Sequence, residues 1–134
     1  MRWMLDTDTC IALIKQRPDS VLKKLRGKAT GQVGISSITL GELAFGASKS
    51  SRSQESHAAL SEFLLPLEVA EFNETAAMHY GEVRADLDRE GRPIGPLDTL
   101  IAAHALAIEV TLVTHNTREF KRVDGLRLED WLKA

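Results

Sequence analysis

The sequence predicts an α/β protein in which helices cover both faces of a central parallel sheet. Short apolar segments alternate with longer helical patterns along the chain, and parallel strands need such crossover connections. The apolar segments contain few polar residues, as strands that are covered on both faces do. The chain has 134 residues, of which 43% are hydrophobic and 27% charged, so we expect one folded domain, residues 1–134.

The first elements are two apolar strands, each followed by helix signals. Residues 3–5 form the first strand, which closes at Asp6. A helical turn over residues 11–14 comes next and stops near Pro18, because proline disrupts a continuing helix. Residues 33–35 form the second apolar strand. Each strand therefore begins a strand–helix unit.

Short polar side chains mark where the following helices begin. Asp19 or Ser20 is expected to cap a helix over residues 21–26. Ser36 or Ser37 is expected to cap the helix that follows the second strand. Both predictions rest on the preference of these residue types for the N-cap position.

The middle of the chain predicts a helix, a strand and a second, longer helix. Residues 54–65 have an amphipathic pattern that ends before Pro66. Residues 67–72 alternate between apolar and polar side chains, as a half-buried strand does. Asn73 is a good cap for a helix that continues to about Arg89.

The C-terminal third predicts one more strand–helix unit and a short final strand. Glycines and prolines within residues 91–96 form a rigid turn. An alanine-rich helix over residues 98–109 is apolar enough to be buried. Residues 111–114 form the fourth strand, a turn begins at Asn116, and residues 126–128 form the last strand.

Composition excludes several classes of protein. The net charge is -2, from 17 basic and 19 acidic residues, so the chain does not bind nucleic acid through overall basicity. A single cysteine, Cys10, excludes an internal disulfide and fits a reducing compartment. No apolar run approaches the roughly 20 residues of a membrane span. The first residues reach Asp6 too soon for a signal peptide, so a cytoplasmic protein without membrane association is expected.

Carboxylates and one amide follow the predicted strands, and these residues are the candidate functional set. They are Asp6, Glu42, Asp98, Asn116 and Glu119. Parallel strands all end at one edge of a sheet, where ligands bind in α/β proteins, so we expect the five side chains to converge. Carboxylates that lie close together need a counter-cation to remain ionised, and an oxygen-rich cluster suits Mg²⁺ or Mn²⁺. Taken singly, Glu42, Asp98 and Glu119 also fit ordinary structural roles on helices.

Four motifs together resemble the PIN-domain ribonucleases, and more closely the VapC toxins of type II toxin–antitoxin systems. The motifs are MLDT (residues 4–7), ISSITLGEL (35–43), GRPIGPLD (91–98) and VTHNTREF (113–120). Each motif alone is a weak signal, whereas four in this order and spacing are a strong one. The resemblance covers the chain from end to end and implies a three-layer α/β/α sandwich.

The resemblance implies Mg²⁺-dependent endonucleolytic cleavage of RNA that leaves a 5′-phosphate and a 3′-hydroxyl. Asp6, Glu42 and Asp98 match the acidic triad of the family, with Asp6 and Asp98 as metal ligands. Asn116 stands where other PIN domains often have aspartate, and Glu119 is expected to supply the fourth carboxylate. With Asn116, Thr114 is expected to position water or phosphate.

The resemblance also implies partners. VapC toxins similar to this chain cut a structured RNA at one site, and in the enteric branch the substrate is initiator tRNA, cut in its anticodon loop, which inhibits translation. A VapB antitoxin holds these toxins inactive by wrapping them and placing a basic side chain in the acidic site, and the toxins form homodimers. Ile11, Leu13, Ile14 and Phe45 are expected to be exposed and to serve one of these interfaces.

Three other classes of protein share part of this sequence pattern. A haloacid-dehalogenase-like phosphatase has a strand that ends in Asp-x-Asp, and residues 5–9 come close, with Asp6 as the nucleophile and Asp8 as the acid or base. A receiver-like signalling module lacks its acceptor aspartate here, because Asn73 and Glu74 follow the third strand. An inactive PIN fold that serves only as a binding platform would not need the acidic triad.

Overall fold

Five parallel strands form the centre of the molecule, in the order β3-β2-β1-β4-β5. The computed structural model describes residues 1–133. The strands are β1 (Trp3–Leu5), β2 (Val33–Ser36), β3 (Glu68–Ala70), β4 (Thr111–Val113) and β5 (Leu128–Glu129). The predicted parallel sheet is therefore confirmed.

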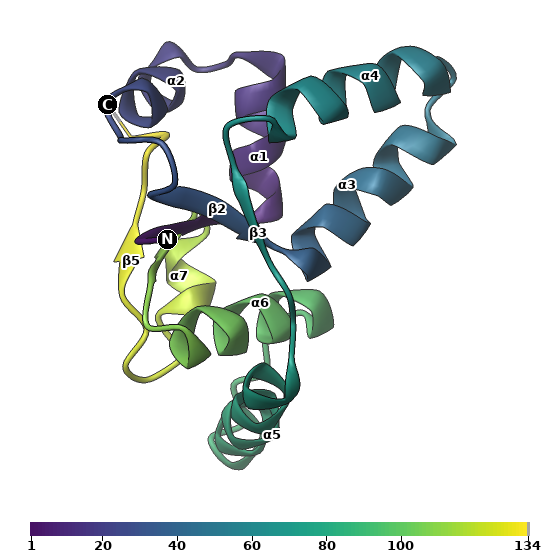
Figure 1. Cartoon of the computed structure of the whole chain (residues 1–134). Helices are drawn as coiled ribbons and strands as arrows, with labels where there is room; N and C mark the ends of the chain where they lie inside the picture. Colours follow the sequence, from purple (N-terminus) through teal and green to yellow (C-terminus); the bar gives the residue numbers. More distant parts are fainter. Residues whose placement is uncertain (134) are drawn as a thin grey trace.

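Helices cover both faces of this sheet (Figure 1). They are α1 (Thr7–Lys15), α2 (Asp19–Arg26), α3 (Ser37–Lys49), α4 (Ser53–Leu64), α5 (Glu74–Arg89), α6 (Pro96–Ala107) and α7 (Thr117–Phe120). Helices α1, α2 and α4 lie on one face and α5 and α6 on the other, while α3 runs outward from the sheet and α4 returns toward α1 (Figure 1). This is the predicted three-layer α/β/α sandwich.

The core divides into two clusters because successive residues of a strand point to opposite faces. Met4 and Leu112 are fully buried against α5 and α6. Leu5 and Val113 are fully buried against α1 to α4. Residues 101–105 of α6 are all buried, as its alanine-rich sequence predicts. The central strands are thus fixed from both sides, which holds their carboxyl ends in place.

Two predicted features of local structure are wrong. Helix α2 begins after Pro18 without a side-chain cap, because the Ser20 hydroxyl donates to the carbonyl of Leu132 at 3.3 Å instead and Asp19 lies inside the first turn. Asn116 begins the short helix α7 rather than a turn.

Strand and helix limits otherwise differ from prediction by a few residues. The last strand lies at Leu128–Glu129, not 126–128, because its register pairs Leu128 with Leu112 of β4. The third strand is limited to Glu68–Ala70 at the edge of the sheet. Among residues 1–133, the helices are too short or too polar to cross a membrane.

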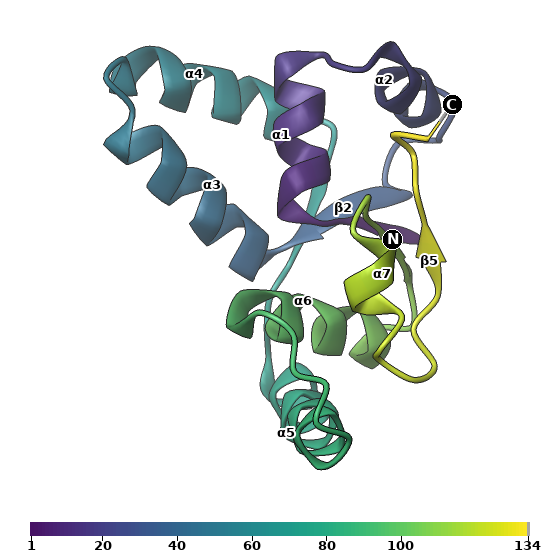
Figure 2. The same ribbon diagram turned by 180° about the vertical axis from the view of Figure 1, so that it is seen from behind.

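The topology makes the carboxyl ends of β1 and β4 the point where the connections of the sheet diverge. From β1 the chain crosses to β2 through α1 and α2 on one face, and it reaches β4 through α5 and α6 on the other. Ligands bind where the connections of neighbouring strands diverge in this way. Figure 2 shows α1, α3, α6 and α7 around this end of the sheet.

Candidate active site

Asp6 lies at the end of β1, directly beside Thr114 at the end of β4. Leu5 pairs with Val113 in the sheet, and the Asp6 backbone N–H donates to the Val113 carbonyl at 3.0 Å. The Asp6 side chain caps α1, since its Oδ1 accepts the Thr9 backbone N–H at 2.9 Å. Only 4% of Asp6 is exposed, so the strand end and the cap together fix this carboxylate.

Burial raises the pKa of Asp6 above its ordinary value. Hydrogen bonds from Thr114 and Thr9 oppose this shift because they favour the ionised form, and the charge of Asp8 adds to it. The Thr114 hydroxyl also accepts the Asn116 backbone N–H at 3.0 Å. Thr114 therefore connects Asp6 to the segment that follows β4.

Asp98 lies in the first turn of α6, two residues after Pro96 occupies the first helical position. Burial and the nearby carboxylates raise its pKa to about 6. Of those carboxylates, Glu119 has the largest effect, followed by Asp6 and Glu42. These three acids therefore lie near enough to Asp98 to repel its charge, although within residues 1–133 no three of them form a close metal-ligand group.

Glu42 lies on α3, one turn beyond its start, and a threonine hydroxyl holds it. The Thr7 hydroxyl donates to Glu42 Oε1 at 2.7 Å and lies 3.3 Å from the Thr39 hydroxyl. Thr7 follows Asp6 at the start of α1. Asp6 caps α1, and the next residue, Thr7, orients Glu42. The start of α1 therefore positions two of the acids.

Glu119, on α7, is bound through both carboxylate oxygens. Its Oε1 accepts the Gly95 backbone N–H at 2.8 Å, and its Oε2 accepts a hydrogen bond from the Asn116 side chain. A Cβ placed on Gly95 would lie 3.6 Å from Asp98 Oδ2. Glu119 thus connects α7 to the turn that precedes Asp98.

The site has a surplus of negative charge. None of the ion pairs formed by residues 1–133 involves Asp6, Glu42, Asp98 or Glu119. Arg122, which follows α7, donates to the Pro93 carbonyl at 2.9 Å rather than to one of these carboxylates. A bound cation would favour the ionised forms of these carboxylates.

The donor set fits a hydrated divalent cation. Within residues 1–133, no three Asp, Glu, His or Cys side chains form a ready-made metal cage. Mg²⁺ does not require one, because it keeps several waters and binds through one or two carboxylates. Asp6 and Asp98 supply two carboxylates that are held from different elements. Burial is the main cause of the raised pKa of Asp98, and repulsion from nearby carboxylates, which a cation relieves, adds to it.

Two contributors were not identified from the sequence. Thr7 orients Glu42 and Gly95 donates its N–H to Glu119. Both lie inside motifs that the sequence singles out, but only the fold brings them to their partners. One predicted interface residue is wrong: Leu13 is buried, whereas Ile11 and Phe45 are exposed. The period of α1 turns Leu13 toward the core.

Comparisons with known proteins agree with this geometry. The family model described as PIN domain matches residues 3–126. A tRNA(fMet)-specific endonuclease VapC of Shigella flexneri is 45% identical over 131 residues, which is 98% of each chain. A ribonuclease VapC2 of Rickettsia felis is 43% identical over 134 residues, 99% of this chain and 100% of the relative.

Solved structures match over the same extent. A DNA-bound VapBC complex from Salmonella typhimurium has a TM-score of 0.93 and 44% identity, over 98% of each chain. VapBC2 from Rickettsia felis, bound to a promoter DNA fragment, has a TM-score of 0.92 and 42% identity, over 98% of this chain and 99% of that one. Neither the family model nor these relatives support the phosphatase interpretation.

Proposed function

Because this chain belongs to the PIN domain family, we propose that it is the toxin of a VapBC toxin–antitoxin system and a site-specific endoribonuclease. The relatives that match it over almost their whole length are named endonucleases or ribonucleases VapC. The observation that carries the proposal is the group of uncompensated carboxylates around Asp98. Initiator tRNA is the proposed substrate, cut in its anticodon loop, since two relatives are named tRNA(fMet)-specific endonucleases.

PIN-domain nucleases generally depend on a divalent metal, and for this chain we propose Mg²⁺, with Mn²⁺ as a substitute. Asp6 and Asp98 are its proposed ligands. When bound, the ion lowers the pKa of a coordinated water and neutralises charge on the phosphate. Oxygen ligands without cysteine or histidine favour these two ions over zinc.

The remaining site residues are proposed to position the reacting groups. Glu42, held by Thr7, is placed to orient the attacking water. Thr114 keeps Asp6 in place by hydrogen bonding. Asn116 is exposed, and its side-chain oxygen is proposed to contact water or phosphate while its amide nitrogen donates to Glu119. Glu119 is proposed to act by holding Gly95 and Asn116, because its oxygens are already engaged.

The VapB antitoxin is proposed to occupy a groove next to the site. A cavity of about 330 Å³ is lined mainly by apolar side chains of α1, α3 and α4, with Ile11 and Ile14 among them. Glu42 lines the same groove. An antitoxin segment that places apolar side chains there can direct a basic side chain to the carboxylates, where it replaces the metal and blocks RNA.

The toxin is also proposed to form homodimers within the complex and to act in the cytoplasm. Exposed apolar residues outside the antitoxin groove are available for the dimer contact, namely Phe45, Met78 and Leu97, of which 65%, 73% and 46% are exposed. Cys10 is free and buried, which suits a reducing compartment. The whole chain, residues 1–134, is proposed to be one PIN domain.

The decisive experiment is cleavage of total cellular RNA by the purified toxin, with Mg²⁺ and with chelator, beside the Asp6→Asn variant. We expect discrete fragments of initiator tRNA that require both Mg²⁺ and Asp6, and that disappear when the cognate antitoxin is added. A folded, antitoxin-free protein that cuts no RNA would refute the proposal.

A further inference from the structure

A buried histidine that the proposed mechanism does not use lies between the helices that carry Asp98 and Glu42. His104 belongs to α6, whose first turn holds Asp98, and only 1% of His104 is exposed. Its Nδ1 lies 2.8 Å from the hydroxyl of Ser36, which is fully buried. Ser36 ends β2 and caps α3, the helix of Glu42. Within residues 1–133, no other side-chain hydrogen bond joins α6 to the β2–α3 segment.

The Ser36 hydroxyl donates to His104 in this hydrogen bond. Its oxygen already accepts the Ile38 backbone N–H at 3.0 Å, and among residues 1–133 its hydrogen has no acceptor other than His104 Nδ1. Nδ1 can accept only if the imidazole is neutral, and burial lowers the pKa of His104 accordingly. The ring proton therefore lies on Nε2.

The Nε2 atom of His104 shows that stability alone does not explain this histidine. It is buried and has no hydrogen-bond partner within residues 1–133, although the Glu71 backbone lies near enough to oppose the lowered pKa. Phe72 packs edge-on against the imidazole, with 5.4 Å between ring centroids, so an apolar side chain would also suit the surroundings. A buried N–H without a partner costs free energy that such a side chain would avoid.

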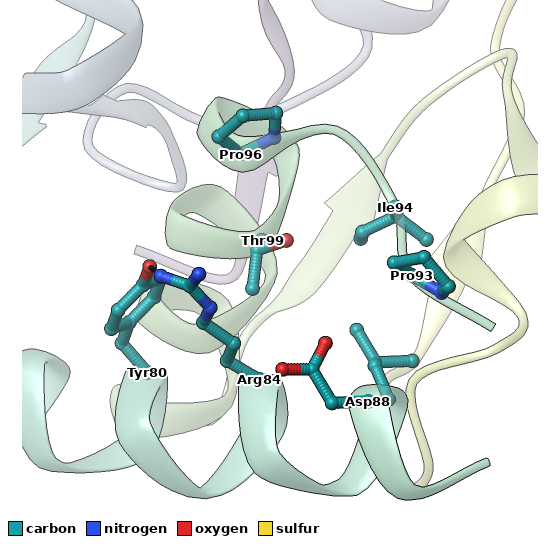
Figure 3. Close-up of a pocket in the computed structure, with 8 residues that line it drawn as sticks. Tyr80, Arg84, Asp88, Pro93, Ile94, Pro96 and Thr99 are labelled. Carbon is teal, nitrogen blue, oxygen red and sulfur yellow. Dashed lines mark hydrogen bonds between the residues drawn. The ribbon is translucent and has the colours of Figure 1, made fainter. Parts of the chain in front are cut away.

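Helix α6 is itself held in place by α5, which packs along it. Tyr80 and Arg84 of α5 line a pocket of about 150 Å³ together with Pro96 and Thr99 of α6 (Figure 3). The Thr99 hydroxyl donates to the Gly95 carbonyl at 2.8 Å, which stabilises the first turn of α6. The position of α6 is therefore a fixed reference for any helix that is bonded to it.

The hydrogen bond at Ser36 acts on Glu42 through the first turn of α3. Thr39 in that turn lies 3.3 Å from the Thr7 hydroxyl, and Thr7 donates to Glu42 at 2.7 Å. Because α3 runs outward from the sheet (Figure 2), a change in its direction at Ser36 displaces Glu42. A displacement of about 1 Å can reduce the rate of a reaction about 100-fold.

We propose that His104 is a positioning residue of the ribonuclease. Through the Ser36 hydroxyl it fixes the start of α3 relative to α6, and so sets Glu42 against Asp98. His104 itself contacts neither RNA nor metal. This inference rests on the proposed ribonuclease function and adds to it a residue that acts from the core.

The first test compares two variants of His104. His104→Leu removes the acceptor and also the unpaired N–H, so its kcat should fall about tenfold, while KM stays unchanged and Tm stays within about 4 °C of the wild type. His104→Asn keeps an acceptor close to the place of Nδ1 and should retain most of the rate. Equal rates for the two variants, or a higher KM for His104→Leu, would overturn the proposal.

A matched control lies at the outer end of α3. His57 of α4 is exposed, and its Nε2 lies 3.1 Å from the hydroxyl of Ser48, so His57→Leu removes another histidine–serine hydrogen bond to the same helix. This bond lies beyond Glu42 along α3, and its loss should leave kcat unchanged. A tenfold fall for His57→Leu as well would show that any support of α3 has this effect, which contradicts a specific role for His104.

Double variants test the route from His104 to Glu42. His104→Leu should lower the rate no further in Ser36→Ala or in Glu42→Gln, because residues of one network have non-additive effects. Effects that multiply in either background would overturn the proposed route. Ser36→Ala alone should lose about tenfold, which keeps the proposal testable if His104→Leu does not fold.

The tautomer of His104 is a readout that is independent of RNA cleavage. In protein labelled with ¹⁵N-histidine, the His104 signal is the one of four that His104→Asn lacks. We expect a proton on Nε2 and none on Nδ1 at pH 7, and Ser36→Ala should shift the Nδ1 resonance. A protonated Nδ1 would contradict the hydrogen bond on which the proposal depends.

The outcomes separate this inference from the proposed function. A wild-type protein without Mg²⁺-dependent RNA cleavage would reject the ribonuclease, and the positioning role with it. Cleavage by His104→Leu at the wild-type rate would reject the positioning role alone. A fall in rate that accompanies an equal fall in Tm for both His104 variants would assign His104 a structural role only, which also overturns the proposal.

Discussion

The end of β1 and the first turn of α6 each present one aspartate to the site, but they hold it differently. Asp6 is almost fully buried and is held by Thr9 and Thr114. Asp98 is half-buried, and its pKa rises to about 6 through burial together with repulsion from other carboxylates. Local hydrogen bonds fix the position of Asp6, whereas burial, and after it the charges of distant segments, raises the pKa of Asp98.

The difference indicates a division of labour between the two aspartates. Asp6 has a fixed orientation before any ligand arrives, so it supplies a preorganised oxygen. Asp98 is the carboxylate whose ionisation depends on what neutralises its neighbours. Metal binding is therefore expected to lower the pKa of Asp98 more than that of Asp6, since an added cation reverses the repulsion.

The largest expected effect is the loss of cleavage when either aspartate is neutralised. Asp6→Asn and Asp98→Asn should each reduce the single-turnover rate at least about 10³-fold, because metal-ion catalysis contributes several kcal/mol and each 1.36 kcal/mol is tenfold. Circular dichroism should show that both variants fold, since asparagine also caps α1 at residue 6. A variant that folds and keeps more than about a tenth of the rate would remove that aspartate from the proposed metal site.

The next effect concerns the residue that connects Asp6 to Glu42. Thr7→Val removes the hydroxyl bonded to Glu42 with little change in shape, and cleavage should fall about 10- to 100-fold, as when other supports of metal ligands are lost. Thr7→Ser is the matched control and should retain most of the activity. Equal rates for Val and Ser would show that Glu42 needs no support from α1.

A smaller effect separates two roles for Glu119. Its oxygens hold Gly95 and Asn116, so Glu119→Ala should reduce cleavage about tenfold by loosening the turn before Asp98. Glu119→Gln retains an acceptor for Gly95 and should lose much less. If Gln is as inactive as Asp98→Asn, Glu119 acts through its charge, and the site has a third essential carboxylate beside Asp6 and Asp98.

The smallest effect is on the stability of the metal-free protein. The pKa of Asp98 is about 6 in the folded state and 3.8 as its ordinary value, so the folded state binds more protons between these pH values. The contribution of Asp98 to stability is therefore fully present below about pH 3.8 and is lost as pH rises through about 6. After allowance for solvent screening, Asp98→Asn should gain roughly 1 kcal/mol at pH 7, or about 3 °C in Tm.

Thermal denaturation at several pH values with chelator measures this gain. It should vanish near pH 4, and Asp124→Asn, an exposed carboxylate, should show none at any pH. Added Mg²⁺ should stabilise the wild type but not Asp98→Asn, because a ligand stabilises only the state that binds it. An unchanged or lower Tm for Asp98→Asn at pH 7 would contradict the repulsion that distinguishes Asp98 from Asp6.

Local sequence determined the elements whose signals are short-range. Apolar runs located the central strands at residues 3–5 and 33–35, and Asn73 caps α5 as predicted, with its Oδ1 accepting the Ala76 N–H at 3.1 Å. Burial of β1 and β4 on both faces is encoded in apolar residues that leave few alternatives. The family motifs likewise singled out Asp6, Glu42 and Asp98 as the candidate acids, because motif spacing reflects a shared fold.

Only the tertiary structure decided which hydrogen bonds hold the acids and which of the acids has a raised pKa. The hydrogen bonds of Thr7 to Glu42 and of Gly95 to Glu119 join segments 35 and 24 residues apart, so no local pattern encodes them. The raised pKa of Asp98 arises from burial and, after it, from carboxylates of other segments that the fold brings near it. Sequence thus fixes the chemistry available to this protein, whereas long-range packing sets the distances and burial on which charge and hydrogen bonding depend.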